Sequence, residues 1–160
     1  MAIGIYKQVA KDIMTKHVAT IRSKETIHDA LMLMAENRLS ALPVINRAGK
    51  CIGMISQSDI ISMARDKDVE DSEVVAGRNS AADLLFGGVA LDEITNERVD
   101  DMMSDRVVMA APDEAVTDIA DKMLEQEIHH IPVVDGDDNL VGIVSTMDIL
   151  AALRAPLPTT

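Results

Sequence analysis

The 160-residue sequence has no tryptophan, one tyrosine (Tyr6) and one phenylalanine (Phe86). Aromatic side chains are the usual stacking partners of nucleic-acid bases, so any bound base is expected to lie between aliphatic or methionine side chains. Basic residues are also few, with 15 Lys and Arg against 27 Asp and Glu and a net charge of −12. Because phosphate backbones are held chiefly by Lys and Arg, nucleic acid is excluded as the expected partner.

The sequence also has a single cysteine and no long hydrophobic run. Cys51 has no second cysteine with which to form an intrachain disulfide, and its neighbours Ile52 and Gly53 predict a small buried side chain. No apolar run approaches the roughly 20 residues of a membrane span. Residues 1–11 lack the apolar stretch of a signal peptide. We therefore expect a soluble, cytoplasmic protein without membrane insertion.

The sequence does contain an internal repeat. Residues 12–65 align with residues 101–154 at a constant offset of 89 without a gap, and 14 of the 54 pairs are identical. A unit of this size does not usually bury its hydrophobic face alone, so the copies are expected to pack on each other and enclose a cleft. We assign 8–65 to the first repeat, 66–100 to an acidic linker, 97–154 to the second repeat and 155–160 to a disordered tail.

Hydrophobic periodicity predicts the order helix, strand, strand, helix in each repeat. The first helices contain Ile27, Ala30, Leu31 and Met34 in one repeat and Val116, Ile119, Ala120 and Met123 in the other. The predicted strands cover 42–45, 51–55, 131–134 and 140–144. The polar stretches 46–49 and 135–139 predict hairpin turns, and the second lacks the ligand spacing of a calcium loop despite its acids.

The second helix of each repeat is predicted to begin near Ser58 or Asp59, and near Met147 or Asp148, because Ser and Asp cap helices. Its buried face is expected to contain Ile60, Ile61 and Ala64, or Ile149, Leu150 and Leu153. The acidic stretch 66–73 predicts a solvated, mobile excursion. Short helices are predicted at 80–85 and 91–98.

Both strand pairs end in the motif Gly-x-x-Ser-x-x-Asp, from Gly53 to Asp59 and from Gly142 to Asp148, each after an apolar-Pro-Val strand. Together these motifs resemble tandem cystathionine-β-synthase (CBS) domains over most of the chain. The resemblance implies an α/β (α+β) fold of two repeats, each a small sheet with two packed helices, related by a pseudo-twofold axis. It also implies two clefts, which in many relatives hold adenosine nucleotides or related adenosyl ligands, and pairing into homodimers.

The carboxylates that close the two motifs are the central candidates. Similarity to the regulatory gamma subunit of AMP-activated kinase implies that Asp59 and Asp148 accept the ribose hydroxyls, for which an ionised carboxylate offers two oxygens. The hydroxyls just before them stand at a helix N-terminus, which favours phosphate. A plain helix cap is the alternative reading of the same Ser and Asp residues.

In tandem relatives the opposite repeat completes each cleft. The first site is therefore expected to contain Met54, Ser56, Ser58, Asp59, Val107, Val108, His129, His130 and Pro132. The second is expected to contain Val18, Ala19, Ser40, Ala41, Pro43, Ile143, Ser145, Thr146, Met147 and Asp148.

The two sites differ in the cations available for a phosphate. His129 and His130 fall where relatives place His or Arg against phosphate, although two histidines that cap a strand are the alternative. A metal is not expected there, because no third ligand adjoins the pair. The second site has no side-chain cation, and Met147 replaces the usual Ser or Thr. We therefore predict unequal occupancy, with the phosphorylated ligand at the first site.

These expectations combine into a stand-alone sensor of AMP, ADP, ATP, NAD or S-adenosylmethionine that needs no cofactor and acts on an unidentified effector protein. Catalysis is not expected, because no Cys, Ser or Lys is visibly paired with a base and Gly87-Gly88 begins no P-loop. The alternative is a structural dimerisation module whose clefts are empty and whose two motif carboxylates only cap helices.

Overall fold

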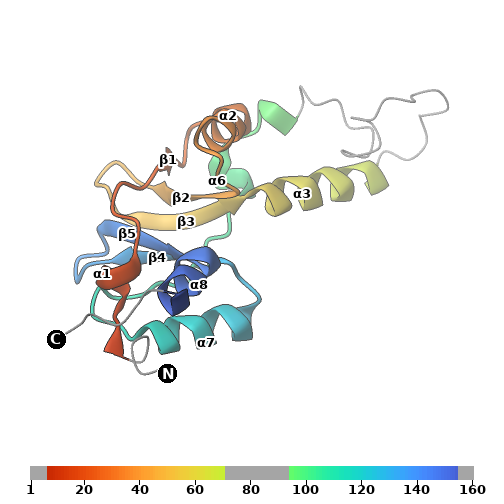
Figure 1. Cartoon of the computed structure of the whole chain (residues 1–160). Helices are drawn as coiled ribbons and strands as arrows, with labels where there is room; N and C mark the ends of the chain where they lie inside the picture. The colour runs from red at the N-terminus through yellow and green to blue at the C-terminus, as the bar shows by residue number, and fades with distance from the viewer. Residues whose placement is uncertain (1–6, 71–93, 155–160) are drawn as a thin grey trace. The chain divides into compact units, whose positions relative to one another are not determined.

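The computed structural model describes residues 7–70 and 94–154 (Figure 1). The chain divides into two compact units, and neither follows the order of the chain. Among the described residues, unit 1 contains 7–18, 45–51 and 106–154, and unit 2 contains 19–44, 52–70 and 94–105. Each unit therefore combines segments from both repeats.

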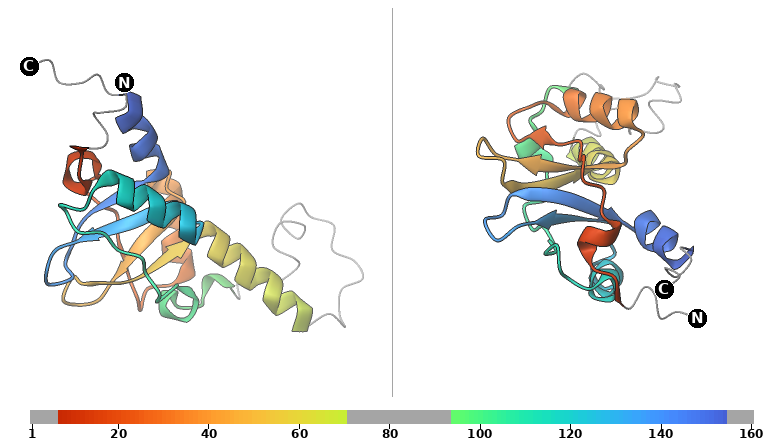
Figure 2. Two further views of the ribbon diagram at one scale, coloured as in Figure 1. Left: turned by 90° about the horizontal axis from the view of Figure 1, so that it is seen from below. Right: turned by 60° about the vertical axis from the view of Figure 1, so that its left-hand side comes forward.

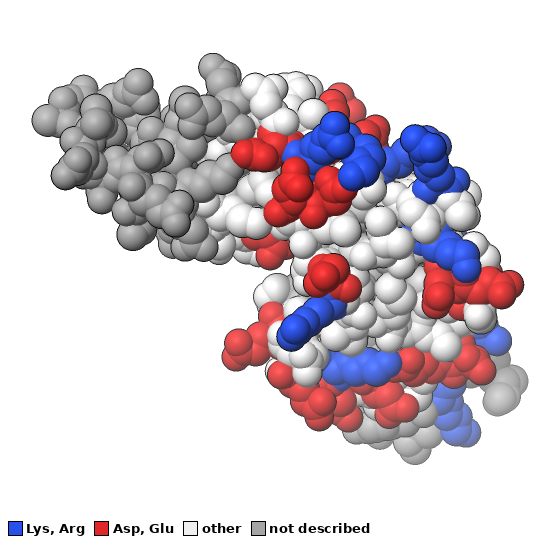
Figure 3. All heavy atoms as spheres, turned by 180° about the vertical axis from the view of Figure 1, so that it is seen from behind, with Lys and Arg blue, Asp and Glu red and all other residues white. Residues whose placement is uncertain are grey.

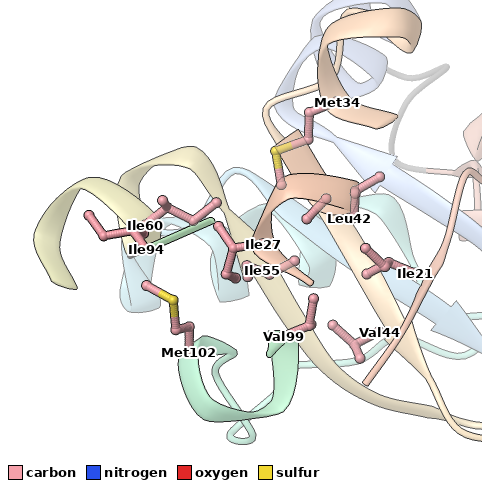
Figure 4. Close-up of a cluster of buried hydrophobic side chains, with 11 residues drawn as sticks. Ile21, Ile27, Met34, Leu42, Val44, Ile55, Ile60, Ile94, Val99 and Met102 are labelled. Carbon is pink, nitrogen blue, oxygen red and sulfur yellow. The ribbon is translucent and has the colours of Figure 1, made fainter. Parts of the chain in front are cut away.

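Unit 2 is built on a three-stranded sheet with the order β1-β2-β3. Its strands are β1 (Ile21–Arg22), β2 (Ala41–Ile45), whose last residue belongs to unit 1, and β3 (Cys51–Ser56), which begins there. The helices are α2 (Ile27–Asn37), α3 (Gln57–Glu70) and α6 (Val99–Met102). Figure 4 shows the buried apolar cluster that joins them, which includes Ile27, Leu42, Ile55, Ile60 and Val99.

Helix α2 lies where its apolar spacing predicts it, with Ile27, Ala30 and Met34 buried. Its start is fixed by a capping box: Thr26 Oγ1 accepts from the N–H of Asp29 at 3.2 Å, and Asp29 Oδ2 accepts from the N–H of Thr26 at 3.0 Å. Its end is marked by Arg38, whose φ of 54° is left-handed. The first predicted helix is therefore confirmed, and the structure sets its boundaries at Ile27 and Asn37.

Unit 1 contains the antiparallel pair β4 (His130–Val134) and β5 (Leu140–Ser145), with the helices α1 (Ala10–Ile13), α7 (Val116–Gln126) and α8 (Thr146–Arg154). The predicted hairpin is confirmed, since Asp135 Oδ1 accepts from the N–H groups of Asp137 at 2.9 Å and Asn139 at 3.0 Å. These bonds are those of a turn, and they occupy the carboxylate that a calcium loop would need.

Each repeat opens with a short helix, α1 in the first repeat and α6 in the second. Helix α1 packs in unit 1 with β4 and β5 of the second repeat, and α6 packs in unit 2 with β2 and β3 of the first repeat. After α1, Thr15 N donates to Ile143 O at 2.9 Å and Ile143 N donates back at 3.0 Å, and Figure 2 shows α1 (red) beside β5. After α6, Ser104 and Met54 exchange bonds of 2.9 and 3.0 Å in the same way. Neither helix was expected from the sequence, because four residues are too few to show a period.

Several predictions differ from the structure. Helices α3 and α8 begin at Gln57 and Thr146, slightly earlier than predicted. The prediction that Leu150 and Leu153 are buried was wrong, since 53% and 57% of their surfaces are exposed. Helix α3 continues to Glu70 and so includes the first residues of the stretch expected to be a mobile excursion.

Other predictions are confirmed in part or lie outside the described residues. Cys51 is buried, as predicted. In the predicted helix 91–98, Ile94 and Thr95 are helical, but Arg98 forms an isolated bridge with Thr26. The segments 80–85 and 155–160 are outside the described ranges. Across 7–70 and 94–154, no helix has the length and apolar character needed to cross a bilayer.

Candidate ligand-binding site

The first motif forms a compact hydrogen-bond network at the start of α3. Asp59 Oδ2 accepts from the backbone N–H of Ser56 at 2.9 Å and from its hydroxyl at 2.6 Å. In return, the N–H of Asp59 donates to Ser56 Oγ at 3.2 Å. This is a capping box with Ser56 at the cap and Asp59 three residues later, which explains why the helix begins before Ser58.

The second motif repeats this arrangement at the start of α8. Asp148 Oδ2 accepts from the N–H and the hydroxyl of Ser145, both at 2.7 Å, and the N–H of Asp148 donates to Ser145 Oγ at 3.2 Å. Both Asp residues therefore take part in helix caps, as the alternative interpretation of the motifs predicts. Both are only partly buried.

The two motifs differ at the residue before the Asp. Ser56 Oγ and Ser58 Oγ lie 2.8 Å apart. Because the Ser56 hydroxyl proton is directed to Asp59, we assign the donor of this bond to Ser58. Met147 stands at the matching position of the second motif and has no hydroxyl to donate.

The first-turn N–H groups of α3 are almost all used. A helix leaves four such groups without a partner inside the helix. Here Gln57 N donates to Ser40 O at 2.9 Å, and the N–H groups of Ser56 and Asp59 bond within the motif. Over the described part of the chain, only the N–H of Ser58 is left. In α8 Thr146 N donates to His129 O at 3.0 Å, which leaves the N–H of Met147.

The atoms that stay available favour ribose over phosphate. Oδ1 of Asp59 and Oδ1 of Asp148 receive no hydrogen bond from the described residues, so each keeps its lone pairs for two hydroxyl donors. A phosphate at either helix start would meet one free N–H instead of several. The hydroxyls of Ser56 and Ser145, predicted as phosphate donors, already donate to the carboxylates.

His130 lies directly opposite Ser145 in the β4–β5 pair. Partners in an antiparallel pair point to the same face, so the imidazole adjoins the Ser145–Asp148 network. Burial lowers the pKa of His130, the neighbouring His129 adds to the decrease, and the charge of Asp148 opposes it. His130 is therefore biased toward the neutral form. The first repeat has Ala41 at the matching position.

The predicted site residues are divided between the two units. Unit 2 contains Ala19, Ser40, Ala41, Pro43, Met54, Ser56, Ser58 and Asp59. Unit 1 contains Val18, Val107, Val108, His129, His130, Pro132, Ile143, Ser145, Thr146, Met147 and Asp148. Within each unit, the motif adjoins the first strand of its own hairpin. Apart from Val18, which shares unit 1 with Asp148, the predicted grouping of each Asp with the opposite repeat joins residues of different units and stays a prediction.

The closeness of His130 to the Asp148 motif was missed from the sequence. The sequence feature that could have predicted it is the length of the turn between β4 and β5, because this length sets the register that pairs His130 with Ser145. The capping box was also readable, since Ser56 and Asp59 have the spacing of a cap and its reciprocal acid.

The charged side chains of the described chain are of both signs. Blue and red side chains lie next to one another on the face drawn in Figure 3. Ion pairs join Lys24 to Asp100 and Lys122 to Glu114. Within residues 7–70 and 94–154, no three His, Cys, Asp or Glu side chains gather as metal ligands would.

Known proteins share both the sequence pattern and the fold. The CBS domain family model matches residues 10–66 and 99–155. An uncharacterized protein of Methanocaldococcus jannaschii is 31% identical, with 89% of each chain covered. The CBS domain of a membrane protein from Sphaerobacter thermophilus is 30% identical, with a TM-score of 0.71 and coverage of 94% of this chain and 91% of that one. The CBS domain pair of protein MJ0100, in complex with 5′-methylthioadenosine and S-adenosyl-L-methionine, is 26% identical, with a TM-score of 0.66 and coverage of 90% and 94%.

Proposed function

Because the chain belongs to the CBS domain family, we propose that it is a regulatory CBS-pair module that binds an adenosyl ligand through Asp59 and Asp148. One observation supports this most. In both motifs a serine occupies Oδ2 of the carboxylate, and Oδ1 receives no hydrogen bond from the described residues. An ionised oxygen held in place by a helix cap is a pre-oriented acceptor for the vicinal hydroxyls of a ribose.

The ligand class follows from what surrounds these carboxylates. The low aromatic content leaves aliphatic and methionine side chains to contact a purine, and Met54 and Ile143 are partly exposed beside the two motifs. The ligands of the MJ0100 pair, 5′-methylthioadenosine and S-adenosyl-L-methionine, combine a ribose with an adenine and carry no phosphate. Such compounds need little from the helix N-termini, where few N–H groups are free.

We keep phosphorylated ligands as candidates for the first site. AMP, ADP, ATP or NAD would find there the hydroxyl of Ser58, which Met147 replaces in the second motif, and the sequence-based grouping adds His129 and His130. We propose that the first site prefers the phosphorylated ligand. Titration calorimetry with AMP tests this, and equal, tight binding of AMP at two sites would contradict it.

The module is proposed to regulate rather than catalyse, with the ligand as its signal and an unidentified effector protein as its reader. A cytoplasmic location and a homodimer complete the proposal. The exposed apolar side chains of α7 and α8 support pairing, since large apolar surfaces on a protein commonly mark an interface.

A melting experiment with matched variants tests the binding function. A ligand at one hundred times its dissociation constant stabilises the folded state by about 2.7 kcal/mol. We expect 5′-methylthioadenosine, S-adenosylmethionine or AMP to raise the melting temperature of the natural protein. Asp59→Ala with Asp148→Ala should abolish that rise. Failure of all adenosyl compounds, NAD included, to move the melting temperature would sink the proposal.

Asp29→Ala is the control for the loss of a cap. Asp29 accepts from the N–H of Thr26 at 3.0 Å and from its hydroxyl at 2.7 Å, as Asp59 does from Ser56. The control should lower the melting temperature while leaving the ligand-induced rise intact.

The second candidate is a structural dimerisation module, and the complete capping boxes favour it. If capping is the whole role of Asp59 and Asp148, the double variant will melt earlier and still bind the ligand unchanged, or neither protein will bind. The three proteins therefore separate the two functions.

A further inference from the structure

A methionine side chain lies against the motif glycine in each of the two units. In unit 1, Met14 covers Gly142 on the side where a β-carbon would stand, with its Cγ 2.8 Å from that position and its Sδ also in contact. In unit 2, Met103 Sδ lies 2.5 Å from the corresponding position of Gly53. Neither methionine is fully buried. Each residue therefore packs on a motif strand and keeps part of its surface in solvent.

In unit 1, this contact adjoins the hydrogen bonds that join the opening helix to the motif strand. The N–H of Met14 donates to Ala10 O at 2.8 Å and so closes α1. The next residue, Thr15, exchanges two hydrogen bonds with Ile143, at 2.9 and 3.0 Å. Ile143 lies two residues before Ser145, which caps α8. Displacement of Met14 would therefore act on β5 directly before the carboxylate motif.

Unit 2 has the same arrangement at the matching positions. The N–H of Met103 donates to Val99 O at 2.8 Å and closes α6, and Ser104 exchanges two hydrogen bonds with Met54. Met54 lies two residues before Ser56, the cap of α3. At the offset of 89 the two methionines correspond to each other. One chemical change at methionine sulfur would therefore act on both motifs.

Methionine is the sulfur-containing residue that this chain presents to solvent. The sequence contains 11 methionines and one cysteine, and Cys51 is buried, where a thiol is inert. Oxidation of methionine to its sulfoxide changes a flexible apolar side chain into a polar one, and methionine sulfoxide reductases reverse it. The two motif methionines therefore combine partial exposure with a reversible chemistry.

We propose that Met14 and Met103 are sites of reversible oxidation by a peroxide, and that their oxidation releases the opening helices and weakens ligand binding. A lone pair of Sδ attacks one oxygen of hydrogen peroxide, so that an S–O bond forms as the O–O bond breaks. The leaving hydroxide takes the proton of the transferred hydroxyl and becomes water. The sulfur loses two electrons, which the peroxide gains. The effect on binding rests on the proposed function, whereas the effect on the fold does not.

The sulfoxide is poorly suited to the place that the thioether occupies. Its oxygen requires a hydrogen-bond donor or water, and burial without such a partner is unfavourable. The sulfur of each methionine faces the glycine of a strand, so the oxidised side chain has to turn outward to hydrate its oxygen. Helices α1 and α6 have four residues each, too few to be stable without tertiary contacts. Each helix is therefore expected to detach when its methionine leaves the strand.

Graded treatment of the full chain with hydrogen peroxide, stopped with catalase, tests the proposal. Peptide mapping by mass spectrometry gives the sulfoxide fraction at each methionine, and the melting temperature is measured on the same samples. We expect Met32, 48% exposed, to be oxidised without a change in melting temperature. The melting temperature should then fall by about 2–10 °C as the sulfoxides of Met14 and Met103 accumulate. Methionine sulfoxide reductases should restore it.

Matched variants separate these two methionines from the others. Met14→Leu with Met103→Leu keeps an apolar side chain at both positions and removes the oxidisable sulfur. The double variant should keep its own starting melting temperature after the same treatment. The control, Met32→Leu, should lose as much as the natural protein. If the double variant does not fold, the sulfoxide fractions of the natural protein decide the question, because they relate the loss to particular residues.

Titration calorimetry with 5′-methylthioadenosine measures the effect on binding. Oxidation of Met14 and Met103 should raise the dissociation constant by about 5- to 150-fold, the usual range of coupling between two sites. Oxidation of Met32 alone should leave the dissociation constant unchanged. If no adenosyl compound binds the untreated protein, the ligand function fails, while the fall in melting temperature still reports on the oxidation sites.

Four results would overturn the proposal. They are resistance of Met14 and Met103 to a peroxide dose that fully oxidises Met32, an unchanged melting temperature once both are oxidised, equal losses in the double variant and the natural protein, and an unchanged dissociation constant for a ligand that binds the untreated protein. The first three concern the oxidation sites alone. The last leaves ligand binding standing and removes its regulation by oxidation.

Discussion

Met14 fills the space that a β-carbon on Gly142 would occupy, with its Cγ 2.8 Å from that position. Met103 does the same at Gly53, where its Sδ lies 2.5 Å from the corresponding position. At the offset of 89, Met14 corresponds to Met103 and Gly53 corresponds to Gly142. The glycine of the Gly-x-x-Ser-x-x-Asp motif therefore admits the methionine that follows the short opening helix of the other repeat.

Replacing this glycine should destabilise the folded protein. We expect Gly142→Ala to lower the free energy of unfolding by about 1–3 kcal/mol, because the added methyl overpacks the contact with Met14. Gly136→Ala is the control, since nothing lies within 4 Å of its added methyl, and it should have little effect. Chemical denaturation measures both. Met14→Ala in the Gly142→Ala background should recover part of the loss, and strict additivity of the two changes would refute the packing account.

The two long first helices should respond oppositely to changes at their caps. Thr26 caps α2, whereas Ala115 holds the same position before α7 and makes no side-chain cap bond. We expect Thr26→Ala to cost about 1 kcal/mol and Ala115→Thr to gain about 0.5–1 kcal/mol. Asp118 already stands where the reciprocal acid of a capping box belongs. Thermal melting checks both, and a destabilised Ala115→Thr protein would show that α7 starts differently.

His130 should make the folded state sensitive to mild acid. Burial lowers its pKa from the ordinary value of 6.5, so between that value and the lower folded pKa the unfolded chain binds more protons. Stability therefore falls as the pH decreases from about 7 toward 5. His130→Gln should flatten this part of the profile. Equal pH profiles for the natural protein and His130→Gln would contradict the prediction.

The long elements could be predicted because each shows a hydrophobic period or a short apolar run beside a polar turn. Helix α2 has apolar residues at helical spacing, with Ile27, Ala30 and Met34 buried, and β2 to β5 are short apolar runs that flank polar turns. The exact repetition at an offset of 89 meant that a correct assignment in one repeat supported the other. The fold class and the family follow from these features.

The parts that the sequence did not reveal depend on partners distant in the chain. Nothing local shows that α1 joins the strands of the second repeat, because its contacts there, such as Met14 with Gly142 and Thr15 with Ile143, are with residues far away in the chain. The exposure of Leu150 and Leu153 was also not predicted, since apolar residues at helical spacing give the same pattern whether or not their own chain covers them. At the motifs, Asp59 and Asp148 were identified from the sequence. It was not predicted that a serine would occupy Oδ2 of each carboxylate while Oδ1 receives no hydrogen bond from the described residues.

The most direct test of the central claim changes the ligand and leaves the protein intact. If Oδ1 of Asp59 and of Asp148 accepts ribose hydroxyls, 5′-methylthioadenosine and AMP should bind about 10- to 150-fold more tightly than their 2′-deoxy forms in titration calorimetry, as expected for one charge-assisted hydrogen bond of about 1.5–3 kcal/mol. The difference should vanish in the Asp59→Ala and Asp148→Ala double variant and persist in Asp29→Ala. Equal dissociation constants for the ribose and deoxyribose forms with the natural protein would contradict the account.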